Sequence, residues 1–174
     1  MDEDTSRNRK ASRKKEDKNR LYKTHQGGPR TPSLILDSSI IVKLILNEVG
    51  SEEAAVTVAN ALKKGYALHT VDLALAECLN VIWKHVSIIK DLKTEEANAA
   101  VEDLTKLYDG LKVIVGREIA AEAMHVALSQ NISAYDALYI AVAQKINGTL
   151  YTADQKLYAL ASRSGNTKLL KSEP

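Results

Sequence analysis

Four carboxylate side chains, those of Asp37, Glu77, Asp136 and Asp154, stand in apolar stretches of this 174-residue sequence. Asp37 and Asp154 each follow a short apolar run of the kind that forms a buried strand. Glu77 has apolar neighbours three and four residues away, so a helix would turn its side chain at or beside the core. Asp136 is the single charge in a long apolar helical pattern. Carboxylates in such surroundings need partners, and these four therefore indicate chemistry.

Two of the acids also have a local structural interpretation. Asp136 could complete an N-cap pattern that begins at Ser133. Asp154 could be a first-turn acid, with Thr152 and Gln155 forming a capping box. The positive end of a helix dipole would favour either carboxylate.

The other two acids differ in how well local structure explains them. Asp37 could turn the chain together with Ser38 and Ser39. Glu77 has the weakest structural explanation, because a carboxylate on an apolar helix face is rarely buried without a partner. No basic residue is placed in the sequence to pair with the acids, and the nearest candidate is Lys84, two turns after Glu77.

Carboxylates that converge without cationic partners repel one another, and a hard divalent cation removes that repulsion. Mg²⁺ and Mn²⁺ prefer carboxylate and water oxygens. Two such ions about 4 Å apart can activate a water and stabilise the leaving oxygen of a phosphodiester. The sequence has no glycine-rich phosphate loop and no nucleophile elbow, and its four histidines lack metalloprotease spacing. The residues therefore favour metal-assisted phosphodiester hydrolysis.

Alternating strands and helices must position these acids. Short β-like runs predict strands over 33–36, 67–70, 112–115 and 149–151, with an edge strand over 168–170. Helical patterns predict helices over 40–47, 51–64, 71–89, 94–109 with Thr94 as N-cap, 117–130, 134–146 and 153–161. This alternation predicts an α/β fold with three α/β/α layers around a central parallel sheet. Ligands of such sheets gather outside the carboxyl ends of the strands, where Asp37 and Asp154 are expected.

Charge divides the chain into two parts. Residues 1–30 carry ten Lys and Arg against five Asp and Glu, a net +5, whereas residues 31–174 carry fourteen against seventeen, a net −3. We expect residues 1–32 to form a basic, disordered arm before a folded domain over residues 33–171.

Composition excludes several classes of protein. The single cysteine, Cys78, excludes an intramolecular disulfide and a cysteine-based zinc site, and its apolar surroundings predict a core position. Phenylalanine is absent, so the core is expected to be aliphatic. The sequence contains no secretory signal and no apolar segment that could span a membrane, which predicts a cytoplasmic protein without a membrane partner.

Four sequence blocks resemble those of PIN-domain nucleases, in particular VapC-type toxins. The blocks are LDSSIIVK at 36–43, LAECLN at 75–80, SAYDALYIAVA at 133–143 and TLYTADQKL at 149–157, in the order and spacing of the family. The resemblance covers residues 33–171 and implies a PIN-like fold. It also implies an acidic quartet that binds Mg²⁺ or Mn²⁺, made of Asp37, Glu77, Asp136 and Asp154. Ser39 and Thr152 match positions where the family often has a hydroxyl near the metal.

The same resemblance implies an endoribonuclease that acts on RNA, forms a homodimer and is neutralised by a cognate antitoxin. Two alternatives remain open at this point: a PIN nuclease of ribosomal RNA maturation, and a catalytically silent PIN-like binding module. The first kind often carries a zinc ribbon, which one cysteine cannot build. The intact quartet argues against the second. Relative to the family, the arm over residues 1–32 is an addition.

Overall fold

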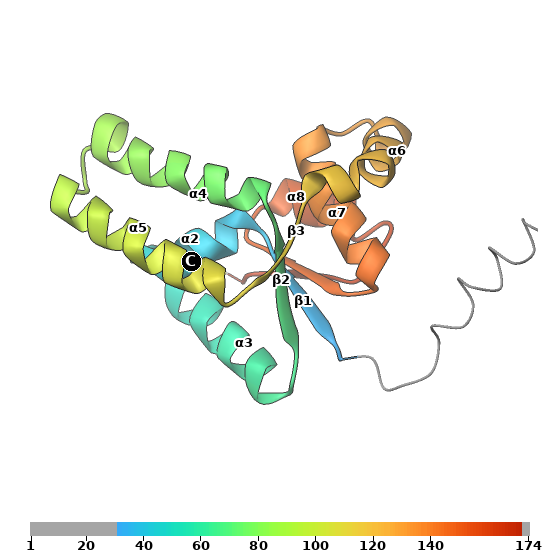
Figure 1. The fold of residues 1–174 in the computed structure, drawn as a ribbon, viewed down its shortest axis with the longest axis horizontal. Helices are drawn as coiled ribbons and strands as arrows, with labels where there is room; N and C mark the ends of the chain where they lie inside the picture. The colour runs from blue at the N-terminus through green and yellow to red at the C-terminus, as the bar shows by residue number, and fades with distance from the viewer. Residues whose placement is uncertain (1–30, 172–174) are drawn as a thin grey trace, which may run out of the picture. The chain divides into compact units, whose positions relative to one another are not determined.

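The computed structural model describes residues 31–171. The arm predicted over residues 1–32 lies outside the described residues, apart from Thr31 and Pro32. The described part has the predicted α/β/α architecture, in which a parallel sheet separates two layers of helices (Figure 1). Within it, none of the helices combines the length and the apolar character needed to cross a membrane.

Five parallel strands form the central sheet in the order β3-β2-β1-β4-β5. Their bounds are β1 Ser33–Leu36, β2 Ala67–Val71, β3 Lys112–Ile114, β4 Thr149–Thr152 and β5 Thr167–Leu169. The predicted strands are thus confirmed, each end within one residue. β1 occupies the centre, and its residues Leu34 to Leu36 are buried because helices cover both faces of the sheet.

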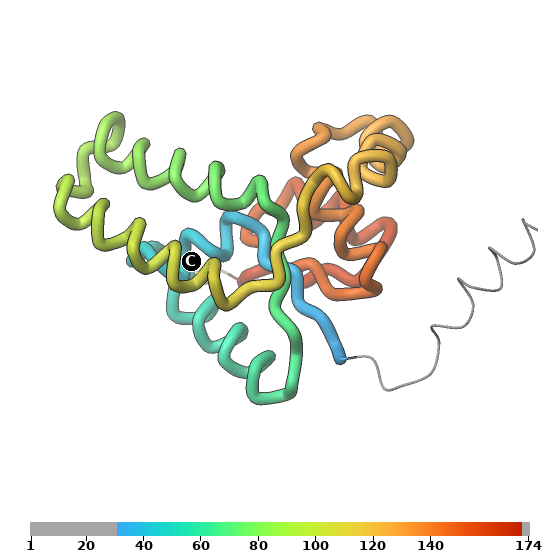
Figure 2. The backbone as a smooth tube through the Cα atoms, in the orientation of Figure 1, coloured from blue at the N-terminus to red at the C-terminus, as the bar shows by residue number. Residues whose placement is uncertain are grey.

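Seven α-helices of the described residues cover the sheet. Their bounds are α2 Ser38–Ile45, α3 Ser51–Lys63, α4 Leu73–Lys84, α5 Thr94–Asp109, α6 Ala120–Gln130, α7 Ala134–Ile146 and α8 Gln155–Ala161. Figure 2 traces the chain through α2 to α5 on one side of the sheet and through α6 to α8 on the other. Right-handed connections between parallel strands produce this division, because the chain crosses the sheet in opposite directions before and after β3.

The helix predicted over residues 71–89 begins and ends differently from the prediction. Val71 belongs to β2 and is paired with Ile114 of β3, so pairing within the sheet prevails over the helical pattern at this residue. At the other end, residues His85–Ile89 form a π-helical turn, η1, which ends at Lys90 with φ +63°.

Three other predicted helices begin at residues different from those predicted. Thr94 is not an N-cap but the first residue of α5, and the Glu96 carboxylate accepts a hydrogen bond of 2.8 Å from the backbone N–H of Lys93. The helix predicted over 117–130 is divided into a 3₁₀ turn, η2 (Gly116–Glu118), and α6. The helix predicted over 40–47 begins two residues earlier, at Ser38.

The core is mainly aliphatic, as predicted, and the Cys78 side chain is buried in it. Two tyrosines are exceptions that composition did not predict. Tyr139 on α7 and Tyr151 on β4 are among the largest fully buried side chains.

The order of the strands creates a crevice at the centre of the sheet. From β1 the chain proceeds to β2 on one side, whereas β4 and β5 lie on the other, so the direction of winding reverses between β1 and β4. The connections that leave β1 and β4 separate at this point, and ligands of parallel α/β sheets bind in the resulting crevice. Asp37 and Ala153 are the first residues after these two strands.

Candidate active site

Asp37 is a buried carboxylate held by hydroxyl groups. Its residue is 5% exposed, although it follows a strand and occupies the N-cap position of α2. One carboxylate oxygen, Oδ2, accepts hydrogen bonds from Ser39 Oγ at 2.6 Å and from Thr152 Oγ1 at 2.7 Å. Ser38 Oγ lies 3.4 Å from Oδ1, and the side chain caps no backbone N–H of α2. The carboxylate is therefore oriented mainly by hydroxyls and not by capping hydrogen bonds to its own helix.

The charge of Asp37 has no cationic partner within residues 31–171. Burial raises the pKa of Asp37 above its ordinary value, and the negative charge of Glu77 raises it further. The hydrogen bonds from Ser39 and Thr152 oppose this rise by stabilising the ionised form. The folded protein thus holds two carboxylates close enough to repel each other.

Glu77 extends from α4 to the same place. It is half-buried, as its apolar helix face predicts, and its Oε2 accepts a hydrogen bond of 2.6 Å from the Tyr139 hydroxyl. The neighbouring Cys78 thiol is buried, and burial together with the charges of Glu77 and Asp37 raises its pKa to about 12. Cys78 is consequently a neutral core residue, as predicted, and not a nucleophile.

Ser39 and Thr152, the two predicted hydroxyl positions, connect Asp37 to the chain beyond β4. Ser39 Oγ accepts a hydrogen bond from the backbone N–H of Ala153 at 2.9 Å, and Thr152 Oγ1 accepts one from that of Asp154 at 2.9 Å. Each hydroxyl therefore donates to Asp37 and accepts from the chain that leads to α8. The two hydroxyls fix the position of Asp37 against this connection.

Asp154 is exposed and is itself the N-cap of α8. Its Oδ1 accepts hydrogen bonds from the backbone N–H groups of Lys156 at 2.6 Å and Leu157 at 3.1 Å. The structural alternative of a first-turn acid with a capping box between Thr152 and Gln155 is wrong, because α8 begins only at Gln155 and the Thr152 hydroxyl donates to Asp37.

Asp136 lies in the first turn of α7 and is half-buried. Ser133 is the N-cap of α7, as the N-cap pattern in the sequence predicted. Its Oγ accepts a hydrogen bond of 3.1 Å from the backbone N–H of Asp136. Asp136 precedes Tyr139 by three residues, so the two side chains lie on the same side of α7. The Asp136 side chain forms no ion pair with any described residue.

Within residues 31–171, no three or more His, Cys, Asp or Glu side chains are grouped so that they could hold one metal ion. The structure brings Asp37 and Glu77 together, whereas Asp154 is tied to α8 and Asp136 stands in the first turn of α7. The Asp37 and Glu77 carboxylates nevertheless fit Mg²⁺, because this ion keeps several waters and is commonly bound through one or two carboxylates. Their unrelieved repulsion favours a divalent cation over an empty site.

A groove of about 410 Å³ lies beside this pair and is lined by residues that include Ser38, Ser39, Ala153 and Asp154. Lys43 also lines the groove, and it is a basic residue that the sequence analysis missed. Its spacing of four residues from Ser39 on one helix could have indicated it. Lys43 Nζ donates to Glu48 Oε2 at 3.2 Å and to the Val49 carbonyl at 2.8 Å, so its charge is already paired.

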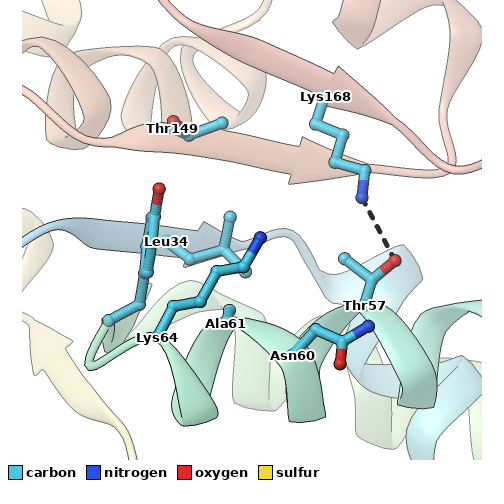
Figure 3. A pocket seen from close by; sticks show the side chains of 8 residues that line it. Leu34, Thr57, Asn60, Ala61, Lys64, Thr149 and Lys168 are labelled. Atoms are coloured by element: carbon cyan, nitrogen blue, oxygen red, sulfur yellow. Dashed lines mark hydrogen bonds between the residues drawn. The ribbon is translucent and has the colours of Figure 1, made fainter.

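A second hollow, of about 260 Å³, lies between α3 and the sheet (Figure 3). Lys64, just after α3, and Lys168 of β5 extend toward it, and Lys168 Nζ donates to Thr57 Oγ1 at 3.2 Å. None of its lining residues carries a carboxylate. This hollow therefore has no acidic group that could hold a cation.

Comparisons with known proteins find similarity in both sequence and fold. The sequence model of the family described as "PIN domain" matches residues 34–162. Ribonuclease VapC3 of Pyrobaculum aerophilum is 38% identical over 124 residues, which are 71% of this chain and 91% of the relative.

Solved structures share the fold at lower identity. VapBC2 from Rickettsia felis, bound to a DNA fragment from its promoter, aligns with a TM-score of 0.53 at 17% identity, over 80% of this chain and 99% of that one. VapC20 of Mycobacterium tuberculosis, described as a Sarcin-Ricin loop cleaving toxin, aligns with a TM-score of 0.53 at 17% identity, over 72% and 93%.

Proposed function

This chain belongs to the PIN domain family, and we propose that it is a metal-dependent endoribonuclease of the VapC type that hydrolyses RNA phosphodiester bonds. Its similarity to ribonuclease VapC3 supports a nuclease, because it extends over nearly the whole relative. The single observation that carries the metal dependence is the buried Asp37 carboxylate. It shares its site with Glu77 and has no cationic partner among residues 31–171.

Asp37 and Glu77 would hold Mg²⁺ or Mn²⁺. Such a cation, when bound, lowers the pKa of its water and stabilises charge on phosphodiester oxygens. Ser39 and Thr152 orient Asp37 by donating to its Oδ2, which leaves Oδ1 with only the 3.4 Å contact to Ser38.

Asp136 and Asp154 would complete the acidic quartet at the rim of the site. Asp154 uses one carboxylate oxygen to cap α8, and its other oxygen forms no hydrogen bond within the described residues. The groove that Asp154 lines offers an approach for the RNA backbone to the buried pair.

The proposed partners are an antitoxin protein and a second copy of this chain. The Rickettsia felis relative is described as VapBC2, and a cognate antitoxin is proposed here by analogy, together with a homodimer and action on cytoplasmic RNA. Exposed apolar side chains on α4 and η1 support a protein partner, since Trp83 is 53% and Ile88 60% exposed.

The proposed activity is tested on a panel of structured RNAs with millimolar Mg²⁺ or Mn²⁺. We expect the wild-type protein to cleave at least one RNA, and both EDTA and Asp37→Asn to reduce the rate by roughly 100-fold or more. Loss of a residue that only orients a metal ligand already costs about 10–100-fold. Asp103→Asn is the matched control. Asp103 forms an exposed surface ion pair with Lys106, and such pairs contribute little to stability, so this variant should cleave RNA at the wild-type rate.

Each unfavourable outcome has a distinct meaning. Cleavage that persists undiminished in EDTA would end the metal-dependent proposal. RNA binding without cleavage at any metal concentration would instead identify a catalytically silent PIN-like module.

A further inference from the structure

Tyr139 contacts the acidic site, although it is not one of the site residues predicted from the sequence. Its side chain extends from α7 and is 2% exposed, and its hydroxyl donates to Glu77 Oε2 at 2.6 Å. The two residues are 62 positions apart in sequence and come from helices on opposite faces of the sheet. The hydrogen bond therefore crosses the carboxyl edge of the sheet at the candidate metal site.

The Tyr139 hydroxyl can act only as a donor to Glu77. A carboxylate has acceptors alone, so the proton of this pair belongs to the phenol. Burial and the negative charges of Asp37 and Glu77 raise the pKa of Tyr139 far above its ordinary value, which keeps the phenol neutral. A hydrogen bond to a charged acceptor is about twice as strong as a neutral one.

A glutamate side chain on a helix has three rotatable bonds, and it loses this freedom when it binds a cation. Tyr139 removes much of that freedom in advance, because it holds Oε2 against α7. The other oxygen, Oε1, accepts no hydrogen bond from any described residue and is available as a ligand.

We propose that Tyr139 is a positioning residue that orients Glu77 for binding of the divalent cation. This inference rests on the proposed function, since it assigns to Tyr139 a role at the same site. It assigns to Tyr139 no contact with RNA and no proton transfer. Its effect should therefore appear in metal affinity and not in the rate at saturating metal.

The test compares Tyr139→Phe with Tyr151→Phe. Both tyrosines are fully buried, but the Tyr151 hydroxyl has no hydrogen-bond partner among the described residues, so its removal serves as the matched control. Binding of Mn²⁺ to each full-length protein is measured from the electron paramagnetic resonance signal of free Mn²⁺. RNA cleavage is measured in parallel over a series of Mn²⁺ concentrations.

We expect Tyr139→Phe to weaken Mn²⁺ binding by roughly 10–100-fold and to recover near-wild-type cleavage when Mn²⁺ is saturating. Tyr151→Phe should bind Mn²⁺ as the wild type does. In a Glu77→Gln background, Tyr139→Phe should change Mn²⁺ affinity little further, because the two residues act as one unit.

Three results would overturn the inference. Wild-type Mn²⁺ affinity in Tyr139→Phe would show that the hydrogen bond does not orient a ligand. Cleavage that more metal cannot restore, with a melting temperature lowered in EDTA, would assign Tyr139 a structural role. Absence of Mn²⁺ binding by the wild-type protein would reject the proposed function as well, and this distinguishes the two failures.

Discussion

Asp37 and Glu77 differ from Asp136 and Asp154 in how the fold uses their charge. The first pair is buried or half-buried, and its hydrogen-bond donors are hydroxyls of Ser39, Thr152 and Tyr139. Of the second pair, Asp154 is exposed and binds two backbone N–H groups of α8, and Asp136 stands in the first turn of α7. Local patterns in the sequence do not divide the four acids into these two pairs, but the fold does.

This difference separates structural from chemical roles. Asp154 stabilises α8 whether or not a metal is present, so a carboxylate at this position has a structural explanation as well as a chemical one. Asp37 forms no side-chain capping hydrogen bond with α2, and its burial costs free energy that no described cation offsets. A carboxylate whose burial costs stability, and which no described cation pairs, is the better candidate for function.

The largest expected effect is a difference between the wild type and Asp37→Asn in how stability depends on pH. Burial and Glu77 raise the pKa of Asp37 above 3.8, so the folded state keeps this proton to a higher pH than the unfolded state does. The stability that Asp37 contributes is consequently lost as pH rises from 3.8 through its folded-state pKa, by about 1.4 kcal/mol for each pKa unit. Without metal, Asp37→Asn should lack this loss and be the more stable protein at neutral pH.

Urea denaturation in EDTA over a pH series measures this contrast. The difference in unfolding free energy between Asp37→Asn and the wild type isolates Asp37, because all other groups titrate in both proteins. If unfolding free energy depends on pH in the same way in both proteins, or if the wild type is the more stable at neutral pH, folding does not raise the pKa of Asp37.

Thr152→Val should give the next largest effect. The change keeps the shape but removes a buried hydroxyl that donates to Asp37 and accepts from the backbone of Asp154. Hydrogen bonds to charged groups contribute about 1.5–3 kcal/mol, so unfolding free energy should fall by about that amount.

Thr70→Val is the matched control for this change. Thr70 is equally buried, but its hydroxyl donates to the neutral carbonyl of Leu36 at 2.8 Å. Its loss should cost about 0.5–1.5 kcal/mol. Equal losses from the two variants would contradict a charged acceptor at Asp37.

The smallest effect concerns the capping role of Asp154. Asp154→Ala should lower the unfolding free energy by about 1 kcal/mol, whereas Asp154→Asn should change it by a few tenths, because asparagine is an equally good N-cap. Thermal unfolding in EDTA measures both. If Asp154 also belongs to the acidic quartet, both variants should lose RNA cleavage, and full activity in Asp154→Asn would restrict Asp154 to capping.

Much of the fold could be predicted from local patterns. The apolar run at β1 and the capped helix over residues 134–146 were specified by residues close together in sequence, and both have the predicted bounds. The boundary at Val71 could not be predicted, because a strand partner 43 residues away, Ile114, competes with the helical pattern there. The N-cap of α8 could not be predicted either. Thr152 is not the cap because its hydroxyl donates to Asp37, and Asp154 caps the helix instead.

The sequence by itself determined which residue types are present and which elements carry them: acids after two apolar strands, an acid on an apolar helix face, and two hydroxyls nearby. Only the tertiary structure decided how these acids divide, because burial and hydrogen bonding depend on contacts across the sheet. Thr152 reaches Asp37 across 115 residues, and Tyr139 reaches Glu77 across 62. A local pattern cannot specify such contacts, since they exist only once parallel strands bring the ends of distant segments to one edge.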